Sequence, residues 1–251
     1  AETDDKLLEK FFDGEEFDKL NIGVEIQDFV EPSLLDKGWE DVVSQYKMMF
    51  EKFNGACSVH GPFLDLKPIS PDKTIREASY NRYLVALNIA KELKAQYIVF
   101  HSQINPFLNE PYIRKLNHDL NKKFFRDILR EIGNFKGTIV IENIFEGDPS
   151  WLRELIDIID LSNVKICLDI GHAKLMSGED QLKNWFKILK DDIKYIHFHW
   201  NNGIYDEHKP PMEENIRLLS DLLEKFDLNP VISLEYKVNS ILLTAFISYP
   251  N

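Results

Sequence analysis

Short apolar runs alternate with longer amphipathic segments along this chain, and each apolar run ends in a polar residue. Short runs of this kind, bounded by turn-forming residues, are typical of buried β-strands. We therefore predict seven strands, at Ile22–Gln27, Ala56–Gly61, Tyr97–Ser102, Thr138–Asn143, Val164–His172, Lys194–Trp200 and Val231–Tyr236.

The longer segments between these runs space their apolar residues as an α-helix does. Between Asp72 and Lys94 the apolar positions recur at about the helical period, at Ile75, Ala78, Leu84, Leu87 and Ala90. The same reasoning predicts helices over residues 39–53, 73–94, 111–133, 150–160, 179–190 and 213–226.

Strands that are apolar almost throughout and alternate with helices are typical of a parallel sheet covered on its outside. No glycine-rich phosphate-binding pattern follows the first strand, which disfavours a doubly wound sheet. We therefore predict the α/β class and a closed (β/α)8 TIM barrel. Because no repeat, low-complexity tract or linker interrupts the pattern, residues 1–251 are predicted to form a single domain.

The eighth strand of such a barrel is absent from this series. The remaining candidate is Leu242–Ser248, but only Lys237–Ser240 separate it from the preceding strand, and a parallel crossover needs about a dozen residues or more. The strand at Ile22–Gln27 in turn has no predecessor. We hypothesise that the strand order is permuted, with the first barrel strand at the C-terminus, or that this strand completes another subunit's barrel in a homo-oligomer.

The composition narrows the classes of partner. Hydrophobic residues make up 44% of the 251, enough for a sizeable core. With 42 acidic and 30 basic residues the net charge is −12, which repels nucleic acid and anionic membranes at long range. A net charge of this sign does not exclude a local basic patch. Cys57 and Cys167 lie in apolar runs and are expected to be buried free thiols. The absence of a membrane-length apolar run or a signal peptide predicts a cytoplasmic protein that does not insert into membranes.

Polar residues recur where the predicted strands end, the edge at which TIM barrels carry their active sites. Singly, each has a structural explanation, such as a hydrogen-bonded histidine or a helix cap. Together they are costly inside apolar strands unless they are paired or bind a metal. The residues at these ends are Glu25, His60, His101, Glu142, Asp169, His172, His197, Asp206, His208 and Glu235; of the seven histidines, His118 and His199 stand outside this set. The pattern predicts a metal site whose ligands are drawn from all of them except Glu25, which is expected to contact substrate. Mixed imidazole and carboxylate ligands favour Zn²⁺, Mn²⁺, Fe²⁺ or Co²⁺ over Ca²⁺ or Mg²⁺.

The same residues carry a family resemblance. The stretches VHGPFLDL, IVFHS, IVIEN, CLDIGH, YIHFHWNNGIYDEH and ISLEYK resemble, in order and spacing, the strand motifs of the endonuclease IV and xylose isomerase-like superfamily, which includes sugar phosphate isomerases and epimerases. The resemblance extends from about Ile22 to Lys237. It implies a TIM-barrel enzyme with one to three divalent ions, zinc or manganese being the expected metals.

The resemblance implies two arrangements of metal. In the endonuclease branch three zinc ions lie together, on His60, His101 and Glu142, on Glu142, Asp169, His197 and Glu235, and on His172, Asp206 and His208. In the sugar epimerase branch a single metal lies on the second of these sets, and Glu142 and Glu235 also act as catalytic acid and base. Every ligand for both arrangements is present, so the ligand set does not choose between them.

The preferred hypothesis is a metal-dependent isomerase or epimerase of a sugar or sugar phosphate. Glu142 would take a proton from the carbon beside the carbonyl group, and Glu235 would return one. Substrate contacts are expected from Glu25, Phe63 and Trp200, the last as a sugar-stacking platform. The acidity of the chain and the few bases near the strand ends favour this hypothesis, the nearest being Lys67, Arg114, Lys174 and Lys209.

Two alternatives stay open. One is a zinc-dependent AP endonuclease, a phosphodiesterase that cuts DNA at abasic sites; the complete three-ion ligand set favours it, and Phe63–Leu64 stand where that enzyme has its DNA-invading residues. Against it, His199–Trp200 replace an Asn-Asp pair of that family, and Pro210–Pro211 replace glycines usual in both branches. The other alternative is a catalytically inactive barrel that has kept its metal ligands.

Overall fold

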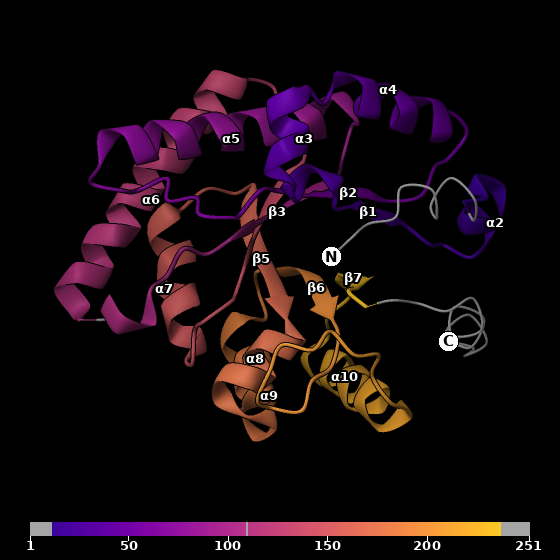
Figure 1. Ribbon diagram of the computed structural model, residues 1–251. Coiled ribbons are helices and arrows are strands. Elements are labelled where there is room, and N and C mark those ends of the chain that lie inside the picture. Colours follow the sequence, from indigo (N-terminus) through magenta and orange to yellow (C-terminus); the bar gives the residue numbers. More distant parts are fainter. Residues whose placement is uncertain (1–11, 109, 237–251) are drawn as a thin grey trace. The chain divides into compact units, whose positions relative to one another are not determined.

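The computed structural model describes residues 12–108 and 110–236. Seven strands are present, β1 (Val24–Ile26), β2 (Cys57–His60), β3 (Tyr97–His101), β4 (Thr138–Glu142), β5 (Val164–Asp169), β6 (Ile193–Phe198) and β7 (Val231–Leu234) (Figure 1). They form one sheet in the order of the chain, β1 to β7. The seven predicted strands are confirmed, although each ends before the predicted residue.

Helices alternate with these strands. They are α2 (Gly14–Lys19), α3 (Pro32–Lys37), α4 (Glu40–Met49), α5 (Lys73–Glu92), α6 (Pro111–Ile132), α7 (Pro149–Ile159), α8 (Ile170–Ser177), α9 (Leu182–Leu189) and α10 (Glu213–Phe226), with short 3₁₀ turns η1 (Asp28–Val30), η2 (Pro106–Leu108) and η3 (Glu179–Gln181). All the predicted helices are confirmed, and α2, α3 and α8 are additional. The alternation of parallel strands and helices confirms the predicted TIM-barrel class.

Contacts between residues divide the chain into two compact units. The first contains the described residues up to Phe100 together with Leu116–Ile139, and the second contains the rest. In the first unit β1 pairs with β2 and β2 with β3, all parallel. The Phe100 ring stacks on Tyr83 of α5 at 4.2 Å, and a side chain at Gly61 would lie 2.2 Å from Phe100. Only glycine therefore fits directly after the end of β2.

In the second unit β5 pairs with β6 and β6 with β7, again parallel. The register sets Asp169 beside His197. Helices α8, α9 and α10 lie together next to these strands (Figure 1). Trp185 of α9 is fully buried and its indole Nε1 donates a hydrogen bond of 2.9 Å to Ser177 Oγ at the end of α8. The apolar faces of these helices thus bury one side of the strands whose ends carry the polar residues.

The predicted strand Val164–His172 is wrong beyond Asp169. The Asp169 carboxylate accepts the backbone N–H of His172 at 2.6 Å, which is the N-terminal side-chain cap of α8. Because this cap satisfies a free N–H of the first helical turn, the chain changes from strand to helix at Asp169. Ile170 and Gly171 are buried, as they would be in a strand, and the apolar pattern therefore concealed the change.

Four other expectations follow from the sequence. The hypothetical strand Leu242–Ser248 and its link Lys237–Ser240 lie outside the described residues, and the prediction of a single domain stays a prediction. Cys57 and Cys167 are buried free thiols, as expected. Among the described residues, no helix has both the length and the apolar character needed to cross a membrane.

Candidate metal centre

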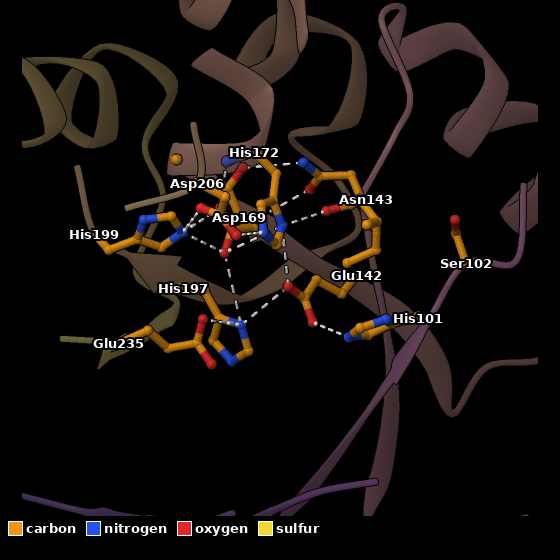
Figure 2. A network of polar contacts seen from close by, with 12 residues as sticks. His101, Ser102, Glu142, Asn143, Asp169, His172, His197, His199, Asp206 and Glu235 are labelled. Atoms are coloured by element: carbon orange, nitrogen blue, oxygen red, sulfur yellow. Dashed lines mark hydrogen bonds and ion pairs between the residues drawn. The ribbon is translucent and has the colours of Figure 1, made fainter. Parts of the chain in front are cut away.

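The strand ends of the second unit bring the predicted polar residues together. His101, Glu142 and Asp169 are the last residues of β3, β4 and β5, His197 lies next to the end of β6, and Glu235 directly follows β7. Figure 2 shows the side chains of these residues pointing toward one another. This is the edge at which a parallel α/β barrel places its active site.

The first cluster consists of Glu142, Asp169, His197 and Glu235. One potential ligand atom from each of the four lies within 4.8 Å of the others. His197 Nδ1 is the common neighbour, at 3.4 Å from Glu142 Oε1, 3.4 Å from Glu235 Oε2 and 3.9 Å from Asp169 Oδ2. His101 adds its Nε2 at 3.5 Å from Glu142 Oε2. Three carboxylates therefore converge on one imidazole.

The side chains of Glu142 and Asp169 are 2% and 0% exposed, yet both carboxylates are held ionised. Burial raises the pKa of Glu142, but His197, His101 and His172 outweigh it and hold that pKa well below its usual value. Burial likewise raises the pKa of Asp169, and the histidines facing it lower the pKa overall. Buried negative charges of this kind need compensation by a positive partner or a cation.

The second cluster consists of His172, His199, Asp206 and His208, whose potential ligand atoms also lie within 4.8 Å of one another. Asp206 Oδ2 lies 3.1 Å from His172 Nε2 and 3.0 Å from His208 Nε2, and Asp206 Oδ1 lies 3.7 Å from His199 Nε2. The rings of His199 and His208 stack nearly parallel, with centroids 3.9 Å apart. Three imidazoles therefore surround one carboxylate.

Asp206 and His208 lie on a loop whose two ends are hydrogen-bonded to each other. Trp200 and Lys209 exchange two backbone hydrogen bonds, of 2.8 and 2.9 Å, and the residues between them form the loop. His208 adopts a left-handed backbone with φ of 46°, a conformation that histidine tolerates better than branched residues do. Its Nδ1 lies 2.8 Å from the carbonyl oxygen of Glu235, which directs its Nε2 toward Asp206.

Without a bound cation, protonated histidines balance the negative charge of Asp206 in the second cluster. Burial raises the pKa of Asp206, but hydrogen bonds from His172 and His208 lower it far below the ordinary value. The hydrogen bond to Asp206 raises the pKa of His208 to about 9. Burial lowers the pKa of His172, yet the carboxylates of Asp169, Asp206 and Glu142 raise it well above the ordinary value. An imidazole must be neutral to bind a metal, so a cation here would displace protons.

His172 and Asp169 join the two clusters. His172 Nδ1 lies 3.3 Å from Glu142 Oε1 and 3.5 Å from Asp169 Oδ2, while its Nε2 faces Asp206. Asp169 Oδ2 in turn lies 3.2 Å from His199 Nε2. Figure 2 shows the resulting continuous network of dashed contacts. A charge bound in either cluster will therefore affect the other.

The two donor sets fit divalent cations. The first cluster offers three carboxylates and one imidazole, and the second offers one carboxylate and three imidazoles. Zinc bonds of about 2.0–2.1 Å to such atoms in a tetrahedron put the ligand atoms roughly 3.3 Å apart. The separations between neighbouring ligand atoms in the two clusters, from 3.0 to 3.9 Å, lie close to that value. Mixed nitrogen and oxygen donors suit zinc, manganese, iron and cobalt.

Two residues of the site, Asn143 and His199, are outside the predicted site set, although His199 is a potential ligand by its residue type. Asn143 directly follows Glu142; its Nδ2 donates to the Asp169 carbonyl oxygen at 3.0 Å and its Oδ1 accepts the Asp169 N–H at 2.9 Å. His199 is fully buried in the second cluster. The alternation of strand faces, which puts His199 on the same side as Tyr195 and His197, is the signal that would have found it.

Three predicted residues belong to the first unit. Glu25 Oε1 accepts a hydrogen bond of 3.2 Å from Gln27 Nε2. His60 Nδ1 lies 2.9 Å from the Gly61 carbonyl oxygen, and the Phe63 ring packs edge-on against His60 at 5.5 Å. The predicted roles of His60 as a ligand and of Glu25 and Phe63 as substrate contacts stay predictions.

The basic residues near the second cluster are engaged by local partners. Lys174 Nζ donates to the Asn201 carbonyl oxygen at 2.8 Å and lies 5.1 Å from the ring centroid of Trp200. Lys209 pairs with Glu207 at 2.5 Å. The stacking role predicted for Trp200 stays a prediction, and one face of its ring already carries a cation.

The chain matches a known protein family. Residues 23–245 match the family described as xylose isomerase-like TIM barrel. The uncharacterized protein MJ1311 of Methanocaldococcus jannaschii is 30% identical over 195 residues, which are 74% of this chain and 66% of that protein. The chain thus spans just under two thirds of the length of this relative.

Several solved structures share the fold. The TTHB071 protein from Thermus thermophilus, soaked with ZnCl2, has a TM-score of 0.74 and 23% identity, with 98% of this chain and 92% of that one covered. A D-tagatose 3-epimerase-like protein has a TM-score of 0.70 and 24% identity, with 89% and 85% covered. An AP endonuclease, family 2, from Brucella melitensis has a TM-score of 0.61 and 17% identity, with 88% and 84% covered.

Proposed function

The chain belongs to the xylose isomerase-like TIM barrel family, and on that premise we propose that it is a divalent-metal-dependent isomerase or epimerase of a sugar or sugar phosphate. The observation that carries the proposal is the pair Glu142 and Glu235. Each has a carboxylate oxygen 3.4 Å from His197 Nδ1, and Figure 2 shows them on either side of that ring. Two carboxylates flanking one position are what proton transfer at a substrate carbon requires.

The first cluster would hold the metal through Glu142, Asp169, His197 and Glu235. A divalent ion there supplies Lewis acidity, which polarises a substrate carbonyl and makes the adjacent C–H more acidic. His101 lies beside Glu142 and would donate a hydrogen bond to a substrate hydroxyl. The similarity to a zinc-soaked protein and to sugar epimerases supports the choice of metal and substrate class.

Glu142 and Glu235 would divide the proton transfer between them. Glu142, as a carboxylate, would accept a proton from the carbon beside the carbonyl group. As that C–H bond breaks, its electron pair forms a C=C bond and the carbonyl π electrons move to the oxygen, which gives an enediolate. Glu235, in its protonated form, then delivers a proton to the opposite face of the same carbon in an epimerase, and the carbonyl re-forms. In an isomerase the proton goes to the former carbonyl carbon, while the proton of the adjacent hydroxyl passes to the enediolate oxygen.

Exchange with solvent deuterium tests the proposal. The metal-loaded protein in D2O, given ketohexoses such as D-tagatose, D-psicose and D-fructose, is expected to place deuterium on the carbon beside the carbonyl, as followed by NMR. Glu142→Gln and Glu235→Gln are each expected to reduce product formation at least about 100-fold, because each removes one proton-transferring group. Glu179→Gln, an exposed change of the same kind, should leave the rate unchanged.

A second candidate, a phosphodiesterase acting on abasic DNA, is favoured by one observation, the second cluster beside the first. Against it, binding to a DNA backbone needs several phosphate-contacting bases, and Lys174 and Lys209 are engaged with Asn201 and Glu207. Abasic duplex is therefore expected to stay intact. Cleavage abolished by Glu142→Gln, with no deuterium exchange into any sugar, would overturn the isomerase proposal in favour of the nuclease.

A further inference from the structure

His199 has the position of a ligand without having been assigned as one. Its side chain is 0% exposed, and its Nε2 faces both Asp169, at 3.2 Å, and Asp206, at 3.7 Å. The histidines around Asp206 share this direction, because the Nε2 atoms of His172 and His208 lie 3.1 and 3.0 Å from Asp206 Oδ2. Three imidazole nitrogens therefore point at one carboxylate.

The orientation of these rings is fixed before any ion binds. His172 and His208 each direct Nδ1 toward a backbone carbonyl oxygen, at 3.0 and 2.8 Å, which is the usual support for a metal-binding histidine. His199 is held by packing and by the contact of its Nε2 with the Asp169 carboxylate. Its ring stacks on His208 and also lies against Gly171, where an added Cβ would be 2.0 Å from His199 Cε1.

We propose that His199 is the fourth protein ligand of the second cluster and closes it. A zinc ion held there by three imidazoles and one carboxylate has its tetrahedral shell filled by the protein, with no coordination position left for solvent. Closed sites of this kind are structural, whereas catalytic zinc sites keep one position open. The second cluster is thus a structural cation site that fixes the loop between Trp200 and Lys209. This inference concerns metal binding and does not depend on the sugar chemistry proposed for the first cluster.

Metal binding to the full chain tests this inference directly. The Glu142→Gln variant, whose first cluster is weakened, is stripped of metal and titrated with Co²⁺ and, in competition with a chelator, with Zn²⁺. The second cluster is expected to give the intense visible absorption of four-coordinate Co²⁺. Adding His199→Asn is expected to weaken Zn²⁺ binding at least about tenfold and to reduce that absorption, because one ligand is lost. Tyr205→Phe on the same loop should change neither.

A second variant distinguishes the loss of a ligand from misfolding of the His199→Asn variant. Gly171→Ala keeps His199 but adds a Cβ 2.0 Å from its Cε1, so the ring must move, and the same losses as in His199→Asn are expected. Gly147→Ala is the matched control, since its added Cβ would lie 3.5 Å from the nearest atom, an ordinary contact. Unchanged Co²⁺ absorption and Zn²⁺ affinity in both His199→Asn and Gly171→Ala would overturn the proposal and leave His199 as a residue that only orients Asp169.

Discussion

At the scale of single residues, Asn143 shows how the site is held in place. Its amide donates to the Asp169 carbonyl oxygen and accepts the Asp169 N–H, so both backbone groups of one residue are bound by one side chain. With the backbone fixed, the Asp169 carboxylate can reach His172, His197 and His199 in a single orientation. Groups that orient metal ligands in this way matter nearly as much as the ligands themselves.

Replacing Asn143 should therefore weaken the site without touching a ligand. Asn143→Ala is expected to lower metal affinity about 10–100-fold and the free energy of unfolding by about 1–3 kcal/mol, since two buried backbone groups lose their partners. Isothermal titration with metal and urea unfolding measure the two effects. Asn88→Ala, which removes one helix-surface hydrogen bond to Leu84, is the control for affinity. Equal metal affinity in the two variants would show that Asp169 does not need this support.

The strand-end acids and histidines were predictable because charged residues inside apolar runs stand out. His199 was visible in the same way as a potential ligand, but it was left out of the predicted set because it departs from the family pattern. Asn143 was also visible in the stretch IVIEN. Its role was not, because it depends on how β4 and β5 lie next to each other, which no local pattern records.

At the scale of elements, Asp192 links α7 to β5 through two ion pairs. It lies in the turn before β6, with its carboxylate oxygens 2.5 Å from Arg153 of α7 and 2.5 Å from Lys165 of β5. Burial raises the pKa of Asp192, but the hydrogen bonds from Lys165 and Arg153 outweigh it and lower the pKa below the ordinary value. The ionised carboxylate is therefore bound more favourably in the folded chain than in the unfolded one.

A depressed pKa stabilises the fold above the unfolded pKa, about 3.9, and this contribution is lost as the pH falls below it. Asp192→Asn is expected to lower the free energy of unfolding by about 1–3 kcal/mol at pH 7, less than for a fully buried pair because Arg153 and Lys165 are 23% and 26% exposed. Urea unfolding between pH 7 and pH 3 measures the effect. The difference from the wild type should shrink below about pH 4.

The control for this prediction is Asp157→Asn, which removes the other carboxylate facing Arg153. Asp157 is 63% exposed, so its loss should change stability by no more than about 0.5 kcal/mol. If the two variants have equal free energies of unfolding at pH 7, Asp192 does not link α7 to β5 as proposed. The same conclusion follows if the destabilisation caused by Asp192→Asn grows as the pH falls.

The periodicity of the sequence predicted where most helices and strands lie, but it did not predict where some of them end. The apolar run from Val164 continues through Ile170, and nothing in that run distinguishes a strand from a buried helix. The change of structure depends on a capping contact between Asp169 and His172, three residues apart. The short helices α2 and α3 were missed for a related reason, since six residues give too little periodicity to identify a helix.

At the scale of the whole molecule, acidic charge and metal binding are linked. The chain carries a net charge of −12, and four of its carboxylates converge in the two clusters. A divalent ion that binds only the folded chain stabilises it by about 2.7 kcal/mol at a concentration 100 times its Kd. Removing the metal with EDTA is therefore expected to lower Tm by roughly 5–10 °C in a domain of this size, as measured by calorimetry.

Readdition of Zn²⁺ or Mn²⁺ should restore the Tm, and Glu142→Gln should show a smaller change because it weakens the first cluster. A Tm that responds neither to EDTA nor to added metal would contradict the assignment of these residues as ligands. The architecture itself was predictable at this scale from the alternation of strands and helices. The question of the eighth strand was not, because the evidence for it lies in Leu242–Ser248, outside the described residues.

The exchange of backbone hydrogen bonds between Trp200 and Lys209 has a kinetic consequence. Asp206 and His208 both lie on the loop whose ends this backbone pair holds together. When one of these two donors dissociates from a bound ion, the other keeps it close, so the released donor rebinds quickly. The backbone pair that holds the loop ends together would therefore lengthen the residence time of the ion.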